Sequence, residues 1–450
     1  MKYLKIGRKL IEFNKMKSRN RNVEFFLLLF VAALVVAGYV LASLGRSSAI
    51  PANIIPFLVG ILLLLLLAHL AVRRFAPNAD FSLLPLAGLL NGIGYFVIAR
   101  LDKDLAGLQA TWTLVGVGAF IATLVLIPQI RRIEQYRYIL MTIGVIFLIM
   151  PLIPGFGREI NGARIWVSLG PINFQPGEFA KIVLAVFFSA YIVEKRDVLA
   201  VSGARRFGIT FPELRHFGPI LLAWGISLIV MVAEKDLGSS LLFFTLFVVL
   251  LWISTGKTSY LGVSAILFFG GALLAWSQFA HVKERVDIWI HPFNDPTGDG
   301  YQIVQSSFAL AEGGLTGTGL GVGNPENIPA VETDFILAAI GEELGLIGTT
   351  AVLILFLLMV GAGLKISLMS SRPFEKLLSS GLTTLLGFQA FIIIAGVVRL
   401  LPLTGVTLPF VSYGGSSLVA NWILLALLLR ISDEARGSET DENPTSTEVR

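Results

Sequence analysis

The chain has 450 residues, of which 55% are hydrophobic and only 14% are charged. Its mean hydropathy of +0.78 lies far above that of soluble domains, so we expect an integral membrane protein. There are no cysteines, which excludes thiolate chemistry and Cys-ligated metals. Membrane orientation explains the net charge of +5 better than nucleic acid does, and we expect no nucleic-acid partner.

Apolar segments long enough to cross a bilayer recur along the chain and predict an all-α polytopic fold. We expect about twelve transmembrane helices, at residues 24–45, 53–72, 81–99, 108–128, 138–156, 175–193, 217–233, 237–254, 259–281, 334–364, 377–398 and 416–430. With the N-terminus inside, 25 of the 35 Lys and Arg lie in inner segments. This bias predicts that both termini are cytoplasmic.

The pattern of spans divides the chain into four parts. Residues 1–22 form a basic cytoplasmic segment, 23–80 hold two N-terminal spans, 81–430 form the transmembrane core, and 431–450 are a polar tail that we expect to be disordered. The long polar loops face outward under this topology, and the largest of them, 282–333, lies between the ninth and tenth spans.

The span that begins near residue 175 carries two charged residues. Pro176 and Glu178 form an ordinary helix start. Lys181 needs a partner, because an intramembrane cation costs ~2.5–3.5 kcal/mol on insertion scales. Glu178 lies three residues earlier on the same helix face, so a local ion pair and a larger functional network both remain open. Further along, Asp236 in AEKDLGSS is expected to cap the following helix.

The stretch ETDFILAAIGEELG, residues 332–345, carries acids at the start of an apolar run and two more inside it. Thr333 or Asp334 is expected to cap the helix. Glu342 and Glu343 lie ~12 Å deeper and point about 100° apart, so at least one must face protein or a wet cavity. Two classes of function are open at this point, a transporter of a charged or amphiphilic solute and an enzyme acting on a lipid-linked substrate.

Five motifs resemble, in order over about residues 81–430, the signatures of the SEDS family of RodA, FtsW and SpoVE proteins. They are GREINGARIWVSLGPINFQPGEFAK, EKDLGSS, DPTGDGYQIVQSSFALAEGGLTGTGLG, ETDFILAAIGEELG and LPFVSYGGSSL. The family core corresponds to the third to twelfth predicted spans, so residues 23–80 are an addition to it. Thr404 stands where FtsW proteins typically carry a lysine, which favours the RodA, elongation-type branch.

The resemblance implies a peptidoglycan glycosyltransferase that polymerises lipid II into β-1,4-linked glycan strands at the outer face of the bacterial cytoplasmic membrane. The aspartate of the family's Thr-Asp-Phe motif corresponds to Asp334, which would deprotonate the 4-hydroxyl of the acceptor sugar, with inversion at the donor. A pyrophosphate leaves without a proton, so one general base suffices. The other residues expected around the substrate are Arg164, Glu178, Lys181, Asp236, Arg285, Glu342, Glu343, Arg399, Ser412 and Ser416.

The departing pyrophosphate needs positive charge. Arg164, Arg285, Arg399 and Lys181 are the candidate cations, and a divalent cation, Mg or Mn, is the candidate cofactor. The resemblance also implies a partner, a class B penicillin-binding protein that supplies transpeptidation, besides lipid II and the membrane lipids. The alternative function is a lipid II flippase, in which the buried acids line a transport path.

Overall fold

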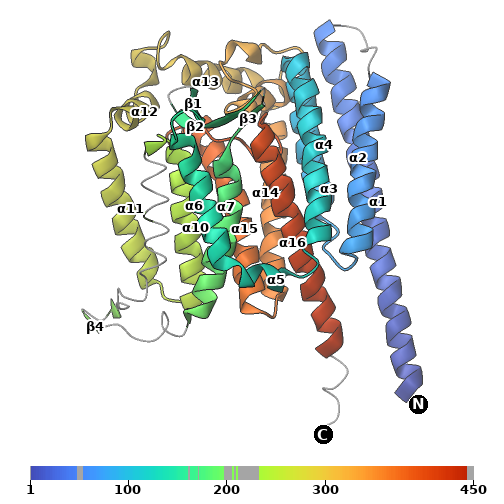
Figure 1. Ribbon diagram of the computed structural model, residues 1–450. Coiled ribbons are helices and arrows are strands. Elements are labelled where there is room, and N and C mark those ends of the chain that lie inside the picture. The colour runs from blue at the N-terminus through green and yellow to red at the C-terminus, as the bar shows by residue number, and fades with distance from the viewer. Residues whose placement is uncertain are drawn as a thin grey trace.

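The protein is described by a computed structural model, which covers residues 2–47, 54–160, 163–170, 172–196, 205–206, 209–210, 225 and 233–442. Helices standing side by side make up most of it (Figure 1). Within the described residues, nine helices are long and apolar enough to cross a membrane. The expected all-α polytopic membrane fold is confirmed, while the exact number of spans stays a prediction.

The helices follow the predicted order. Each predicted span overlaps a helix, except 217–233, which lies outside the described residues apart from its positions 225 and 233. The helices are α1 (Lys2–Ser47), α2 (Ile54–Phe75), α3 (Leu83–Leu101), α4 (Lys103–Leu126), α5 (Ile130–Gln135), α6 (Arg137–Ile149), η1 (Met150–Leu152), α7 (Pro176–Glu194), α10 (Leu237–Thr255), α11 (Ser259–Gln278), α12 (Ala280–Ile290), η3 (Pro292–Asn294), α13 (Tyr301–Gly313), η4 (Pro325–Asn327), α14 (Ile336–Met369), α15 (Pro373–Val397) and α16 (Gly415–Glu442).

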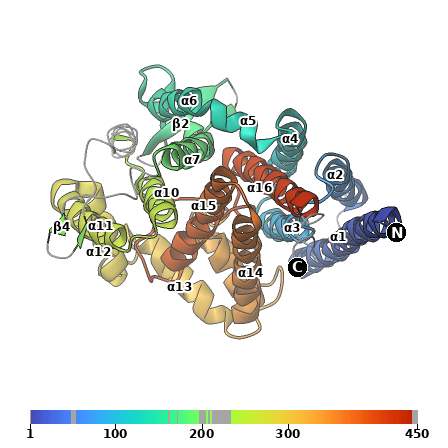
Figure 2. The same cartoon turned by 90° about the horizontal axis from the view of Figure 1, so that it is seen from below.

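The bundle has a centre and two flanks. Seen from below (Figure 2), α7, α14, α15 and α16 occupy the middle, α1 and α2 lie at one edge, and α11 and α12 lie at the opposite edge. The beginning of α1 and the end of α16 lie at the same end of the bundle, opposite α12 and α13 (Figure 1). The structure therefore puts both ends of the described chain on one side, and the cytoplasmic identity of that side stays a prediction.

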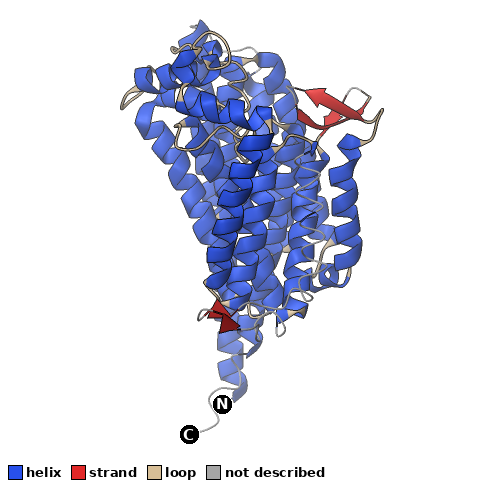
Figure 3. Cartoon of the chain, turned by 90° about the vertical axis from the view of Figure 1, so that its left-hand side faces the viewer, coloured by secondary structure: helices blue, strands red, loops and turns tan. Residues whose placement is uncertain are grey.

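The segment after α6 forms a small sheet. The strands β1 (Gly157–Ile160), β2 (Ala163–Leu169) and β3 (Ile172–Phe174) pair antiparallel in that order at one end of the molecule (Figure 3). The sequence analysis expects only helices and loops. Ile165, Val167 and Leu169 alternate with polar or aromatic residues along β2, which is the period-two pattern of a strand. Two further short strands, β4 (Arg205–Arg206) and β5 (Ile209–Thr210), form a separate pair.

The helix α16 extends further than the sequence predicts. A disordered tail is expected from residue 431, whereas α16 continues to Glu442, and residues 443–450 lie outside the described part. The oxygen atoms of its polar side chains accept hydrogen bonds from backbone N–H groups of neighbouring loops. Asn78 donates to Asp433 at 2.7 Å, and Ile130 donates to Glu434 at 2.7 Å. These bonds hold the polar part of α16 against the segment before α3 and the start of α5, and they satisfy two backbone donors there.

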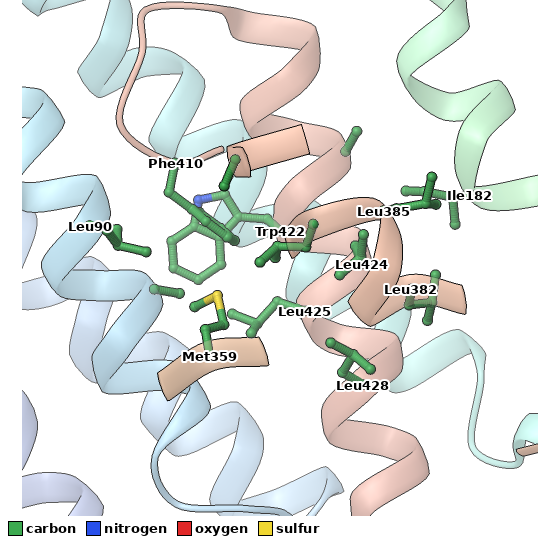
Figure 4. Packing of buried hydrophobic residues seen from close by; sticks show 14 of the residues in the cluster. Leu90, Ile182, Met359, Leu382, Leu385, Phe410, Trp422, Leu424, Leu425 and Leu428 are labelled. Atoms are coloured by element: carbon green, nitrogen blue, oxygen red, sulfur yellow. The ribbon is translucent and has the colours of Figure 1, made fainter. Parts of the chain in front are cut away.

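The side chain of Trp422, in α16, lies in the hydrophobic core and is only 1% exposed. Its ring meets Phe120 and Phe410 edge to face, with centroids 5.7 and 5.8 Å apart. Figure 4 shows Trp422 and Phe410 among the leucines of the neighbouring helices. Gly116 in α4 allows this approach, since a Cβ atom there would lie 2.5 Å from the indole ring. The packing fixes the segment around Phe410, which leads into α16.

Candidate functional site

The chain turns sharply just before α14 and presents Asp334. Ala330 adopts a positive φ of 52°, and its carbonyl oxygen accepts hydrogen bonds from the backbone N–H of Thr333 at 3.1 Å and of Asp334 at 3.3 Å. The helix begins only at Ile336, with Phe335 in the cap position and no side-chain cap bond. The prediction that Thr333 or Asp334 caps this helix is therefore wrong. The turn at Ala330 stands in place of a side-chain cap, so the Asp334 carboxylate is not used in capping α14.

Arg285 from α12 and Asp334 reach the same small space beside Gly405. Both terminal nitrogens of the Arg285 guanidinium and Oδ2 of Asp334 lie 3.8 Å from the point where a side chain on Gly405 would begin. Gly405 has a positive φ of 72°, which favours glycine and keeps this space open. Arg285 is oriented by donating a hydrogen bond to the Leu403 carbonyl oxygen at 3.1 Å. An acid and a cation from distant parts of the chain thus converge.

Burial raises the pKa of the half-buried Asp334 carboxyl to about 6, and the Glu332 charge acts in the same direction. The Thr333 hydroxyl and the Arg285 charge oppose this rise. Asp334 therefore is mostly ionised at pH 7 but holds a proton better than an ordinary aspartate does. A carboxylate with its pKa near the working pH suits general-base catalysis.

Ser412 and its neighbour hold the Asp334 turn from the other side. The Ser412 hydroxyl donates to the Thr333 carbonyl oxygen at 2.5 Å. The backbone N–H of Tyr413 donates to the Glu332 carbonyl oxygen at 2.8 Å. These two bonds attach residues 332–334 to the loop that precedes α16. Ser412 thus orients the backbone around Asp334.

Ser416 holds the start of α7. Its hydroxyl accepts a hydrogen bond from the Gln175 backbone N–H at 3.0 Å, and Gln175 is the cap residue of that helix. Pro176 at the first helical position and Glu178 in the first turn are as predicted. The SYGGSS segment therefore connects the start of α7 to the Asp334 turn.

Lys181 belongs to a buried network. Its ammonium group lies 2.8 Å from the Glu178 carboxylate and donates to the Gln389 side-chain oxygen at 2.9 Å. The Gln389 amide in turn donates to the Thr407 carbonyl oxygen at 2.8 Å. A cavity of about 10 Å³, roughly the room for one water molecule, lies among these side chains. The local ion pair that the sequence analysis left open exists, and it is extended across α15 to the loop that carries Gly405.

Arg399 ties α12 to the loop after α15. Its backbone has a positive φ of 59°, and its carbonyl oxygen accepts from the Trp289 indole at 3.0 Å. The Arg399 guanidinium donates to the Trp289 carbonyl oxygen at 3.3 Å. This reciprocal pair sets the position of α12, the helix that carries Arg285.

Arg164 and Asp236 both lie close to Glu234, just before the start of α10. The backbone N–H of Arg164, in β2, donates to the Glu234 carbonyl oxygen at 3.0 Å. Asp236 accepts from the Ser239 backbone N–H at 3.0 Å, so the predicted helix cap is confirmed. Burial, with Asp236 nearby, raises the pKa of Glu234 to about 9. Glu234 is an acid that the sequence analysis did not single out.

Glu342 holds the segment 314–328, which we call the glycine loop, against α14. Its carboxylate accepts from the Asn324 backbone N–H at 2.5 Å. Its carbonyl oxygen accepts from the Thr318 N–H at 2.9 Å. Glu342 is only 4% exposed. The loop thus closes onto the first two turns of the helix that follows Asp334.

Glu343 anchors the same loop through Arg100, at the end of α3. Its carboxylate pairs with Arg100 Nε at 2.5 Å, and another guanidinium nitrogen of Arg100 pairs with Glu326 at 2.6 Å. Arg100 also donates to the Gly323 carbonyl oxygen. Arg100 is not among the site residues expected from the sequence. Its position at the end of an apolar span, which called for a partner in the case of Lys181, was the available signal.

No cluster of three or more His or acidic side chains that would hold a metal ion occurs in the part of the chain that the structure describes. Magnesium bound with a substrate pyrophosphate needs only one or two protein carboxylates. The expected divalent cation thus stays a prediction.

A sequence model of the family described as "Cell cycle protein", named for FtsW, RodA and SpoVE, matches residues 98–437. The chain is 46% identical over 427 residues to a peptidoglycan glycosyltransferase RodA of Mycobacterium tuberculosis, covering 92% of this chain and 91% of the relative. It is 33% identical over 333 residues to a probable peptidoglycan glycosyltransferase FtsW of Geobacter sulfurreducens, covering 73% of this chain and 86% of that one.

Solved structures resemble the fold. A chain described under "Structural coordination of polymerization and crosslinking by a peptidoglycan synthase complex" aligns with a TM-score of 0.65 at 25% identity, covering 79% of this chain and 98% of that one. The rod shape determining protein RodA of Thermus thermophilus aligns with a TM-score of 0.57 at 25% identity, covering 79% of this chain and 96% of that one.

Proposed function

The chain belongs to the FtsW, RodA and SpoVE family of cell cycle proteins, and from that premise we propose that it is a peptidoglycan glycosyltransferase of the RodA type. It polymerises lipid II into β-1,4-linked glycan strands. The observation that carries the proposal is the convergence of Asp334 and Arg285 beside Gly405, at the end of the molecule where the long loops gather. The 46% identity to a RodA glycosyltransferase supports the RodA type over the FtsW type.

In this mechanism Asp334 is the general base. It takes the proton from the 4-hydroxyl of the acceptor sugar as that oxygen attacks the anomeric carbon of the donor. The donor's lipid pyrophosphate leaves from the opposite face, so the α-linked donor gives a β-linked product. Because a pyrophosphate is stable as an anion, the reaction needs no general acid. A pKa of about 6 keeps Asp334 ionised at pH 7 and still basic enough to accept the proton.

Arg285 is the cation best suited to the departing pyrophosphate, because its guanidinium lies next to the same space as Asp334. Lys181 is held by Glu178 and Gln389, and Arg399 is held by Trp289. We assign these two to positioning. Arg164 stays a substrate-binding candidate through its place in β2. A divalent cation, Mg or Mn, would add positive charge at the leaving group.

We place the reaction at the outer face of the cytoplasmic membrane, in a multi-pass protein whose termini are cytoplasmic. The bias of Lys and Arg in the sequence supports this orientation. A class B penicillin-binding protein is the proposed partner that crosslinks the strands. The resemblance to a chain from a complex whose title joins polymerisation with crosslinking supports such a partner.

Purified protein, its partner and lipid II in detergent test the proposal. Wild type should make glycan chains, and Asp334→Ala should make none, while Glu332→Gln at the adjacent acid serves as the control. Chains made by Asp334→Ala would mean that another group is the base. A wild-type protein that moves lipid II across vesicle membranes but makes no polymer would favour the flippase. The same assay with and without a chelator tests the divalent cation.

A further inference from the structure

The helix α1 lies outside the residues that the family sequence model matches, yet its outer end packs onto the glycine loop. A methyl group on Gly45 would overlap the Leu320 carbonyl oxygen, and one on Gly321 would overlap the Ala42 carbonyl oxygen. Gly321 also has a positive φ of 79°. The two backbones touch without side chains between them, and glycine on both sides is what permits that approach.

A second contact joins the same end of α1 to the anchor of the loop. The Arg46 guanidinium donates to the carbonyl oxygens of Arg100 and Leu101, the latter at 3.2 Å. Arg100 in turn holds Glu343 and Glu326. The end of α1 therefore contacts both the glycine loop and the end of α3, which carries the arginine that holds the loop to α14.

The rest of α1 is seated firmly enough to act as a support. It lies beside α3 along one flank of the bundle (Figure 2). A methyl group on Gly92 of α3 would overlap the Val35 side chain, and Val35 is 1% exposed. At the start of the apolar part of α1, Arg21–Ser47, Glu24 lies 2.7 Å from the His69 ring of α2 and pairs with Arg21 at 2.5 Å. These contacts hold the part of α1 between Arg21 and Arg46 against α2 and α3.

The glycine loop leads directly to the catalytic turn. Beyond Gly321 and Glu326, the loop ends at Ile328, which is 2% exposed, and two residues later Ala330 begins the turn that presents Asp334. A displaced loop would therefore alter the position of Ala330 and of the carboxylate that follows it. A misplacement of reacting groups by 1 Å can lower a rate by about 10²-fold.

We propose that α1 is a positioning element of the active site, in which Gly45 and Arg46 hold the glycine loop in the conformation that places Asp334 for catalysis. The role in catalysis rests on the proposed glycosyltransferase function, whereas the support of the loop does not. Helix α1 is then a working part of the enzyme.

The test uses alanine substitutions at three glycines of the full chain. Gly45→Ala adds a methyl group against the loop backbone. Gly38→Ala, on the same helix, adds one 2.8 Å from the Phe96 ring, away from the loop. Gly60→Ala in α2 meets nothing within 4 Å. Alanine favours helix at all three positions, so a common loss of helicity cannot explain a difference among them.

Two measurements separate support of the loop from catalysis. The chain has no cysteine, so Ile328→Cys is a single reporter that a water-soluble maleimide reaches only when the loop lifts. We expect Gly45→Ala to speed this labelling and to lower kcat for lipid II polymerisation by about 10- to 100-fold, with a smaller effect on KM. Gly38→Ala and Gly60→Ala should label slowly and polymerise like the parent proteins.

Unchanged labelling in Gly45→Ala overturns the proposal, and so does faster labelling with an unchanged kcat. Equal loss of kcat in Gly38→Ala would also overturn it, because the effect would then come from general packing. Arg46→Lys and Arg46→Ala provide the second variant pair, in which lysine should retain more activity than alanine. If wild type makes no polymer, the proposed function fails, and the labelling still decides whether α1 supports the loop.

Discussion

The acids at the two ends of the stretch 332–345 have opposite roles, although only two turns of helix separate them. Asp334 faces an open space with Arg285 nearby and carries a raised pKa. Glu342 and Glu343 are buried and hold the glycine loop through Asn324 and Arg100. Burial by itself therefore does not distinguish the proposed general base from the acids that hold the glycine loop. The two kinds of acid differ in their partners. The carboxylates of Glu342 and Glu343 accept from the Asn324 N–H and the Arg100 guanidinium, which bind the glycine loop to α14.

The largest effect should come from Asp334→Asn, which keeps the size of the side chain and removes its basicity. We expect the polymerisation rate to fall by about 10²–10⁴-fold, the usual contribution of general-base catalysis. Chain formation from lipid II by the purified protein measures it. The thermal unfolding midpoint should not fall, because Asp334 does not cap α14. A large loss of stability instead would move Asp334 into the structural class of Glu342 and Glu343.

The structural acids should respond through stability. Arg100→Ala leaves the Glu343 carboxylate buried without its cation, which costs about 3–5 kcal/mol when a buried pair is broken. Thermal unfolding in detergent measures the loss. Glu159→Gln, whose pair with Lys235 spans 3.8 Å between exposed side chains, is the matched control and should change stability by about 0–1 kcal/mol. Equal midpoints for both variants would contradict the anchoring role of Arg100.

The pH dependence of kcat/KM should show whether Asp334 acts as the base. Asp334 must be ionised to act as a base, so kcat/KM should fall as the pH drops through about 6. The Arg285 charge lowers the pKa of Asp334, and Arg285→Gln removes that charge. The acidic limb of the profile should therefore move to higher pH in Arg285→Gln. The acidic limb should stay in place in Asp299→Asn, which changes an exposed acid between η3 and α13. A profile unchanged by Arg285→Gln would separate Arg285 from the site.

The smallest effect concerns a cap. Asp236→Ala removes the acceptor for the Ser239 N–H and should lower stability by about 1 kcal/mol. A modest fall of the thermal midpoint, with polymerisation of lipid II retained by the folded protein, is expected. Loss of polymerisation at an unchanged midpoint would instead place Asp236 in contact with substrate.

Local features of the site were predictable where short-range rules decide them. Pro176 begins α7, and Asp236 caps α10, because each depends on residues only one to three positions away. The failures at Thr333, Asp334 and Arg100 involve a backbone turn or contacts with distant segments that the cap pattern does not reveal. Thr333 and Asp334 have the composition of a cap, yet the turn at Ala330 and the Ser412 hydroxyl claim the backbone around them. The role of Arg100 depends on the contact between the end of α3 and the glycine loop, which only the tertiary structure shows.

The all-α polytopic fold comes from the sequence by itself, since a long apolar segment in lipid can satisfy its backbone groups only as a helix. The sequence also placed Asp334 at the mouth of a span, outside its apolar run. Only the tertiary structure decided that Asp334 meets Arg285, while Glu342 and Glu343 hold a loop. The physical reason is that a carboxylate's role depends on which donors surround it, and those donors come from helices far apart in the chain.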